Sequence, residues 1–185
     1  MQITVHVAVT KVLHHQGELT MPLEISDQEK KQARQPHELF LINLITNHIL
    51  LFAAALGVAT SYPLLLLPIF IASASVLIYT LIRARSSLTR DTWFVSCHWQ
   101  VAARRSRMFL SMLSVVSILV AAILLLAGGD PKPQHWAILG AMILPVMVTV
   151  LVLIILETDA MQQASHGGMP KWVREHIPQP RTEAA

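Results

Sequence analysis

Four long apolar runs dominate the pattern of hydrophobic and polar positions along the chain. They cover residues 39–60, 64–82, 108–129 and 136–156, and none contains Asp, Glu, Lys or Arg. Each has about 20 residues, the length a helix needs to cross a hydrocarbon core of about 30 Å. Because backbone groups inside lipid must hydrogen-bond to one another, the runs are predicted to be helices. The pattern predicts an all-α integral membrane protein, a four-span transmembrane helix bundle.

The connections between the runs predict the direction of the spans. Residues 83–107 carry six Arg and one Asp, whereas the connection between the third and fourth runs carries only Lys132 and Asp130. Cytoplasmic loops collect Lys and Arg, so 83–107 is predicted to be a cytoplasmic loop. A tail over 1–38 and a tail over 158–185 then lie in the cytoplasm as well, flanking a transmembrane domain over 39–157. The expected location is the plasma (inner) membrane.

The overall composition agrees with this picture. Hydrophobic residues make up 54% of the chain and charged residues 14%, with a mean hydropathy of +0.53. Soluble domains carry about a quarter charged residues. The pI of 9.4 arises from the Arg-rich 83–107 segment. This indicates topology and contact with anionic lipids, and no nucleic-acid partner is expected. The single Cys excludes an intramolecular disulfide framework.

The segments outside the runs carry local signals. Residues 3–10 alternate apolar and polar side chains, a strand-like pattern, and residues 1–20 are expected to be a flexible extension, with Met21 a plausible start. Ser26 and Glu29 form a capping box that opens a short helix over 27–34, which Pro36 is expected to end. After the last run, a helix should stop at the two glycines 167–168, and residues 170–177 could form two more turns.

An amphipathic segment precedes the third run. Residues 91–107 contain no Gly or Pro and are predicted to extend that helix into the cytoplasm. Their apolar arc is too wide for a solvated helix, so it must be buried, either at the lipid headgroups or against a partner subunit. The expected contact residues are Trp93, Phe94, Trp99, Arg104, Arg105 and Arg107.

A second candidate feature is a layer of polar side chains at similar depth in all four spans. His48 is the only histidine at membrane depth. The structural interpretation is hydrogen bonding between packed helices. The two functional interpretations are a cytoplasm-facing pocket around His48 and an interface for a helix of a partner subunit. The layer consists of Asn43, Asn47, His48, Ser75, Ser111, Ser114 and Thr149.

Other chemistry lacks the residues it needs. A haem held by two histidines requires a second intramembrane His, and the chain's nine His include none other at that depth. No tight metal-ligand spacing, nucleotide-binding loop or hydrolase motif occurs. We therefore expect no metal, no cofactor and no catalytic residues. The predicted function is a non-catalytic accessory or assembly subunit of a larger membrane complex. The alternatives are a small channel or transporter with a pocket around His48 and, more weakly, a lipid-modifying enzyme that uses His98 and the Arg cluster.

Overall fold

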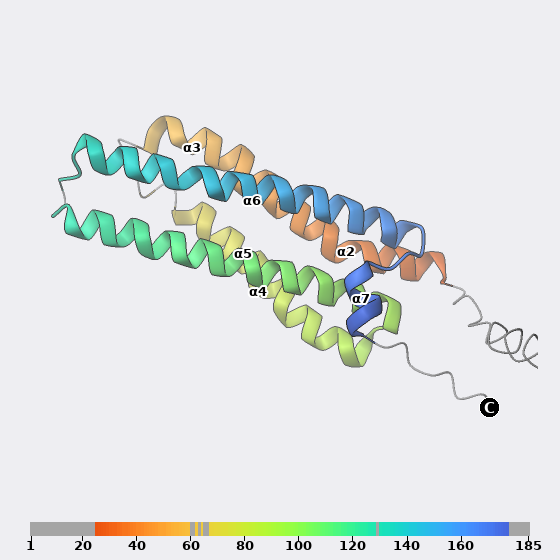
Figure 1. Ribbon diagram of the computed structural model, residues 1–185. Helices are drawn as coiled ribbons and strands as arrows, with labels where there is room; N and C mark the ends of the chain where they lie inside the picture. Colours follow the sequence, from red (N-terminus) through yellow and green to blue (C-terminus); the bar gives the residue numbers. More distant parts are fainter. Residues whose placement is uncertain (1–24, 60–61, 63, 65–66, 129, 178–185) are drawn as a thin grey trace, which may run out of the picture.

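The protein is described by a computed structural model over residues 25–59, 62, 64, 67–128 and 130–177. These residues contain no strand, and four of their helices are long and apolar enough to cross a membrane. The helices run alternately up and down (Figure 1). This confirms the prediction of an all-α chain with four such helices. The alternating pattern at residues 3–10 and the possible start at Met21 lie outside the described residues.

The first long helix consists of α2 (Asp27–Asn43), the π-helix η1 (Leu44–Leu51) and α3 (Phe52–Ala59). Its start is the predicted capping box. The Ser26 hydroxyl accepts a hydrogen bond from the backbone N–H of Glu29, and the Glu29 carboxylate accepts one from the backbone N–H of Ser26. The N-terminal N–H groups that have no partner within the helix are satisfied in this way.

The prediction that Pro36 ends this helix is wrong. Pro36 lies inside α2 and is buried. A proline in a helix interior removes one backbone hydrogen bond and costs about 3 kcal/mol. Here the helix continues because Ala33 and Phe40, on either side of the proline, are fully buried in the bundle core. Burial of this face outweighs the local cost.

The second and third long helices are α4 (Leu67–Arg90) and α5 (Trp93–Leu126). Only Asp91 and Thr92 connect them, so most of residues 83–107 is helical. The predicted extension of the third span is therefore present, and α4 also continues beyond residue 82. At 1.5 Å per residue the 34 residues of α5 span about 51 Å, well beyond a hydrocarbon core of about 30 Å.

The fourth long helix is α6 (Pro133–Ser165), which continues through Pro145. It ends where predicted, because Gly167 has a φ of 72°, a left-handed conformation typical of a glycine after a helix end. The chain then turns back into the short helix α7 (Lys171–His176), which Pro170 precedes. This agrees with the two turns expected over residues 170–177.

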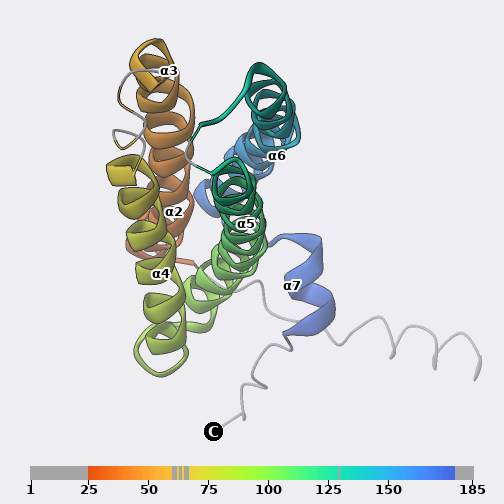
Figure 2. The same ribbon diagram turned by 90° about the vertical axis from the view of Figure 1, so that its left-hand side faces the viewer.

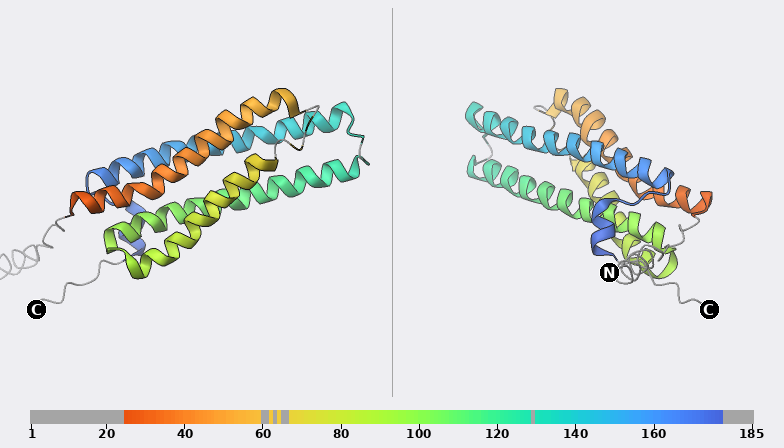
Figure 3. Two further views of the ribbon diagram at one scale, coloured as in Figure 1. Left: turned by 180° about the vertical axis from the view of Figure 1, so that it is seen from behind. Right: turned by 45° about the vertical axis from the view of Figure 1, so that its right-hand side comes forward.

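The two ends of the bundle differ. The start of α2, the turn between α4 and α5, the end of α6 and α7 lie together at one end, here called the polar end (Figures 1 and 3). The opposite end, with α3 and the turn between α5 and α6, is the apolar end. The most extensive contacts between helices are those of α4 with α5 and of α2 with α6, and α2 also packs against α5; Figure 2 shows the four long helices viewed along the bundle. In the most apolar stretches of α5 and α6 only 11% of the residues are buried, so these stretches pack little within the chain.

The amphipathic segment is buried against the chain itself, whereas lipid headgroups or a partner subunit had been expected. Phe94, Val95 and Trp99 pack in one core cluster with alanines of α2, α4 and α6. Cys97 and Val101 pack in another cluster with Val173 of α7. The sequence pattern predicts extensions of the third and fourth helices beyond their apolar runs, but gives no indication that they pack together. All four long helices extend beyond their apolar runs at this end, and together they provide a core for this face.

Candidate functional site

The polar end contains a chain of hydrogen bonds made by buried side chains of three helices. Nδ1 of His37 in α2 lies 2.5 Å from Oε2 of Glu157 in α6, and Nε2 of His37 lies 3.0 Å from Nδ1 of His98 in α5. Nε2 of His98 lies 3.2 Å from the carbonyl oxygen of Gly168, between α6 and α7. The side chains of His37, His98 and Glu157 have no exposed surface. These contacts therefore connect α2, α5, α6 and the start of α7 inside the core.

Arg105 provides the charge that a buried carboxylate needs. Its Nη1 donates to Oε1 of Glu157 and to the carbonyl oxygen of Leu156, each at 3.0 Å. Glu157 thus has an arginine on one carboxylate oxygen and a histidine on the other. Burial of an unpaired carboxylate costs several kcal/mol, and these two partners offset that cost. We call His37, His98, Glu157 and Arg105 the polar-end network.

The geometry limits where the protons of the network lie. A carbonyl oxygen only accepts, so Nε2 of His98 carries a hydrogen that it donates to Gly168. The contact between His37 and His98 needs one further hydrogen, and so does the contact between His37 and Glu157. When all three hydrogen bonds are made, the network therefore holds three protons, one in each contact. With three protons, His98, His37 and Glu157 together have no net charge.

His98 is unsuited to carrying a positive charge at this position. Burial, and next the positive charge of neighbouring His37, lower the pKa of His98 to about 3. Its ring also makes edge contacts with His37 and with Phe94, at centroid distances of 5.2 and 4.9 Å. His98 lies outside the apolar run over 108–129, so its surroundings are protein core. With these hydrogen bonds made, His98 is a neutral ring that accepts a hydrogen bond from His37 and donates one to the Gly168 carbonyl.

A second buried polar cluster lies deeper along the bundle, around Ser73 of α4. The Asn43 amide donates to the Ser73 hydroxyl oxygen at 3.1 Å, and Nε2 of His48 lies 2.7 Å from the same oxygen. Asn47 donates to the Asn43 carbonyl oxygen at 2.7 Å. The π-helix makes this possible, because its i to i+5 hydrogen bonding brings residues five apart, such as Asn43 and His48, toward one face.

The other members of the predicted polar layer do not join this cluster. Their hydroxyl groups donate to carbonyl oxygens four residues earlier in their own helices. This is the usual arrangement for a serine or threonine that has no partner on another helix. The structure therefore brings together Asn43, Asn47 and His48 with Ser73, and leaves apart Ser75, Ser111, Ser114 and Thr149.

An apolar layer separates the two polar clusters. Phe40 lies between His37 and Asn43 along α2, and its ring centroid is 6.2 Å from that of Phe109. The Phe109 ring in turn meets His48 edge-on at 4.9 Å. The layer is completed by other fully or almost fully buried side chains, Leu44, Leu77, Leu113, Val150 and Leu153. No side-chain hydrogen bond in the described part of the chain crosses it.

The predicted contact residues of the amphipathic segment have several roles. Trp93 is half-buried, while Phe94 and Trp99 are core residues, with the Arg83 guanidinium 4.9 Å from the Trp99 ring centroid. Arg104 lies over the ring of Trp172 in α7 at 4.6 Å. Arg105 belongs to the polar-end network, and Arg107 is exposed. Burial against the chain's own helices therefore replaces much of the external contact that had been expected.

The sequence did not indicate the polar-end network. His37 and Glu157 are 120 positions apart, and each lies next to the end of an apolar run, where charged and polar residues are common. One available signal was Glu157 itself, an acidic residue directly after a long apolar run and without a basic neighbour in sequence. Only the packing of α2 against α5 and α6 shows its partners.

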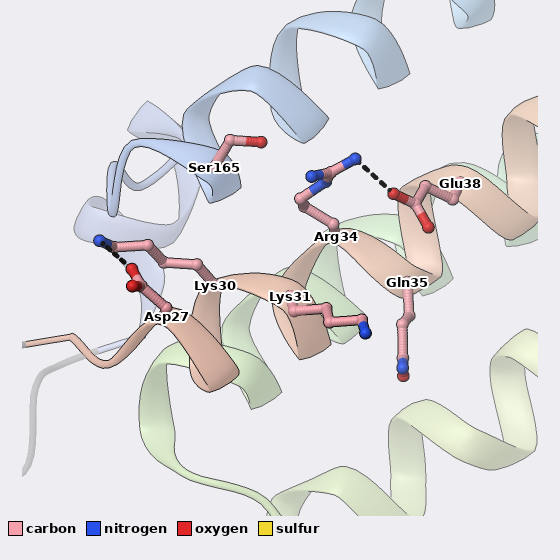
Figure 4. Close-up of a pocket in the computed structure, with 7 residues that line it drawn as sticks. All are labelled: Asp27, Lys30, Lys31, Arg34, Gln35, Glu38 and Ser165. Carbon is pink, nitrogen blue, oxygen red and sulfur yellow. Dashed lines mark hydrogen bonds and ion pairs between the residues drawn. The ribbon is translucent and has the colours of Figure 1, made fainter.

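A surface groove of about 380 Å³ lies between α2 and the end of α6 (Figure 4). Two ion pairs occupy its lining, Lys30 with Asp27 at 3.1 Å and Arg34 with Glu38 at 2.8 Å. These charges already compensate one another at the surface. Among the described residues, no group of three or more His, Cys, Asp or Glu side chains is arranged to hold a metal ion.

No protein-family model matches the chain, and neither does any curated protein or solved structure.

Proposed function

We propose that the chain is a non-catalytic integral membrane protein that serves as an accessory or assembly subunit of a larger membrane complex. It crosses the plasma (inner) membrane four times, with the polar end and both termini in the cytoplasm. The distribution of basic residues supports this direction, because the six Arg of residues 83–107 lie in the parts of α4 and α5 nearest the polar end, while Lys132 is at the apolar end.

The observation that carries the proposal is the loose packing at the apolar end. Leu125 and Leu126 of α5 are 80% and 88% exposed, and α6 exposes Ile138 and Leu144. Helices in membranes associate through close packing and hydrogen bonds between helices, and lipid by itself adds no hydrophobic driving force. A four-helix chain that packs firmly at one end and loosely at the other is suited to receive helices of another subunit between or beside its own.

The buried polar groups support a structural role. Each ring nitrogen of His37 and His98 is engaged in a hydrogen bond within the core, so neither histidine is free to act as a catalytic base toward a lipid. His48 is separated from the polar end by the layer that contains Phe40 and Phe109. This weighs against a channel or transporter that opens from the cytoplasm to His48.

Copurification tests the proposal. The chain, carrying a tag after Ala185, is extracted from its own membranes in a mild detergent, and we expect a second membrane protein in fixed stoichiometry. Ala121→Trp and Ala122→Trp, both at exposed positions of α5, serve as matched variants that point about 100° apart. A tryptophan that faces the partner should reduce the recovered partner at least tenfold, and one that faces lipid should not. Recovery of the chain alone with lipid from several mild detergents would contradict the proposal.

A further inference from the structure

We propose that the polar-end network is a proton-counting clasp, which fastens the connection between α6 and α7 onto α5 and opens when it gains or loses a proton. The proposal is independent of the partner proposed above. It rests on the three hydrogen bonds that join Glu157, His37, His98 and the Gly168 carbonyl in one continuous chain.

The clasp holds α7 as a lid on α5. The His98 bond to Gly168 fixes the chain just before α7 begins. Val173 of α7 is fully buried against Cys97 and Val101 of α5, and Trp172 lies against Arg104. A six-residue helix has little stability by itself, so its position depends on these contacts. Release of Gly168 therefore frees α7 and uncovers Cys97.

The closed clasp needs three protons, whereas the open groups take up protons independently. An imidazole always keeps one N–H and gains a second at its ordinary pKa near 6.5, and a free Glu is ionised at that pH. The open groups therefore hold an average of three protons near pH 6.5. They hold more below this pH and fewer above it. A fourth proton on the closed clasp would place two hydrogens in one contact. Loss of one of the three protons would leave one contact without a hydrogen.

The sign of the pH dependence follows from these counts. Below about pH 6.5 the open state binds more protons than the closed state, so acid favours opening. Above that pH the open state binds fewer, so alkali also favours opening. A plot of the equilibrium constant for closing against pH is therefore bell-shaped, with its maximum near pH 6.5. With ordinary pKa values in the open state, this constant falls about threefold at one pH unit from the maximum and about 25-fold or more at two pH units.

Other charged groups near the clasp are already paired or keep a constant charge. Arg105 of α5 stays protonated and contributes a fixed positive charge to Glu157. On α2, Arg34 pairs with Glu38 at the surface, and on α4 Arg83 pairs with Asp91 at 2.8 Å. Among the described contacts, the clasp is thus made by His37 from α2, His98 from α5 and Glu157 from α6.

Cys97 is a natural reporter of opening. It is the only cysteine of the chain, it is 1% exposed, and α7 covers it. Burial raises the pKa of its thiol to about 12, so the closed form is a poor nucleophile. The experiment measures the rate at which 4,4′-dithiodipyridine modifies Cys97 in the full chain in detergent, from about pH 4.5 to about pH 8.5. Division by the rate for the SDS-unfolded chain at each pH gives a protection factor, which removes the thiol's own titration.

We expect the protection factor to be bell-shaped for the unmodified chain, and two amide variants should each remove one arm. In H98Q the amide still donates to Gly168 and accepts from His37 but cannot take the extra proton. Protection should then stay level below about pH 6.5 and fall above it. In E157Q the amide supplies the hydrogen for the His37 contact, so protection should stay level above about pH 6.5 and fall below it.

H166Q is the matched control, because His166 is an exposed histidine at the end of α6 outside the clasp. It should keep both arms. A flat or monotonic profile for the unmodified chain would overturn the proposal without any variant, and this result also decides the matter if an amide variant fails to fold. Loss of protection by the same factor at every pH in both amide variants would likewise overturn it, because the network would then have only a structural role.

Discussion

Buried ionisable side chains are compensated in this protein by geometry specific to each residue. Glu157 has no exposed surface and receives hydrogen bonds from the guanidinium of Arg105 and the ring of His37. Loss of one partner from a buried ion pair typically costs about 3–5 kcal/mol, because the remaining charge is left without compensation. The packing of α2 against α6 therefore depends on the charge and hydrogen bonds of a single carboxylate, that of Glu157.

Ser73 and Ser75 of α4 are a matched pair for testing what the buried hydrogen bonds contribute to stability. Ser73 receives the Asn43 amide and contacts His48, whereas Ser75 donates to the Ile71 carbonyl of its own helix. Ser73→Ala should lower the free energy of unfolding by about 1–2 kcal/mol, because Asn43 and His48 lose a shared partner inside the bundle. Ser75→Ala should change it by less than about 0.5 kcal/mol. Unfolding by SDS in mixed micelles measures both values.

His48→Gln serves as the control for the chemistry of the cluster, since an amide also offers a donor and an acceptor, and it should be nearly silent. His48→Leu should resemble Ser73→Ala. Equal stability of Ser73→Ala and Ser75→Ala would show that the hydrogen bonds around Ser73 contribute no net stability.

Sequence reasoning identified part of this chemistry. Asn43, Asn47 and His48 are recognisable as polar residues within an apolar run, and in the structure Asn47 bonds to Asn43 while Ser73 links Asn43 to His48. It was not possible to tell Ser73 from Ser75 in advance, because the rotation of α4 decides which serine faces α2. The pairing of His37 with Glu157 was inaccessible for a related reason, since it depends on packing between segments 120 positions apart.

Among the elements, η1 is the least ordinary. A π-helix is uncommon and holds one residue more in each hydrogen-bonded turn than an α-helix. It carries Asn47 and His48 and directly follows Asn43. The wider turn orients Asn43 and His48 toward the same serine, so the extra residue and the polar cluster belong together.

Deletion of Ile45, an exposed residue of η1, should therefore be tolerated. The deletion leaves Asn43 and His48 four positions apart, the spacing that shares a face in an α-helix. We expect the melting temperature in detergent to stay within about 4 °C of that of the unmodified chain, which corresponds to about 1 kcal/mol.

Deletion of Val115, an exposed residue of α5, is the control. It rotates one half of an α-helix against the other by about 100° and should lower the melting temperature by about 10 °C or prevent folding. A similar loss after both deletions would show that η1 is not equivalent to a one-residue insertion.

The extent of the helices shows where local signals suffice. The capping box at Ser26 and the glycines after α6 marked two helix ends correctly, because each signal acts within a few residues. Pro36 suggested a helix end that tertiary packing overrides. The destination of the amphipathic face of α5 also depended on other helices, which a reading of one segment at a time cannot include.

The whole molecule combines a firmly packed polar end with a loosely packed apolar end. The core clusters around Phe94, Cys97 and Val173 lie at the polar end. Outward-facing Leu and Ile side chains continue along the rest of the bundle, as lipid-facing or partner-facing surfaces require. This division agrees with a chain whose polar end folds in water while its apolar end lies in a membrane.

The direction of the chain across the membrane can be tested with two single-cysteine variants in a Cys97→Ala background. Thr89→Cys lies at the turn between α4 and α5, and Asp130→Cys lies at the turn between α5 and α6, and both positions are exposed. Because basic residues concentrate near the first turn, we expect a membrane-impermeant maleimide to label Asp130→Cys in intact cells and Thr89→Cys only after the cells are permeabilised. Cells with Cys97→Ala alone, treated with the same maleimide, give the background labelling. Labelling of Thr89→Cys in intact cells, with protection of Asp130→Cys, would reverse the orientation and place the clasp and α7 outside the cytoplasm.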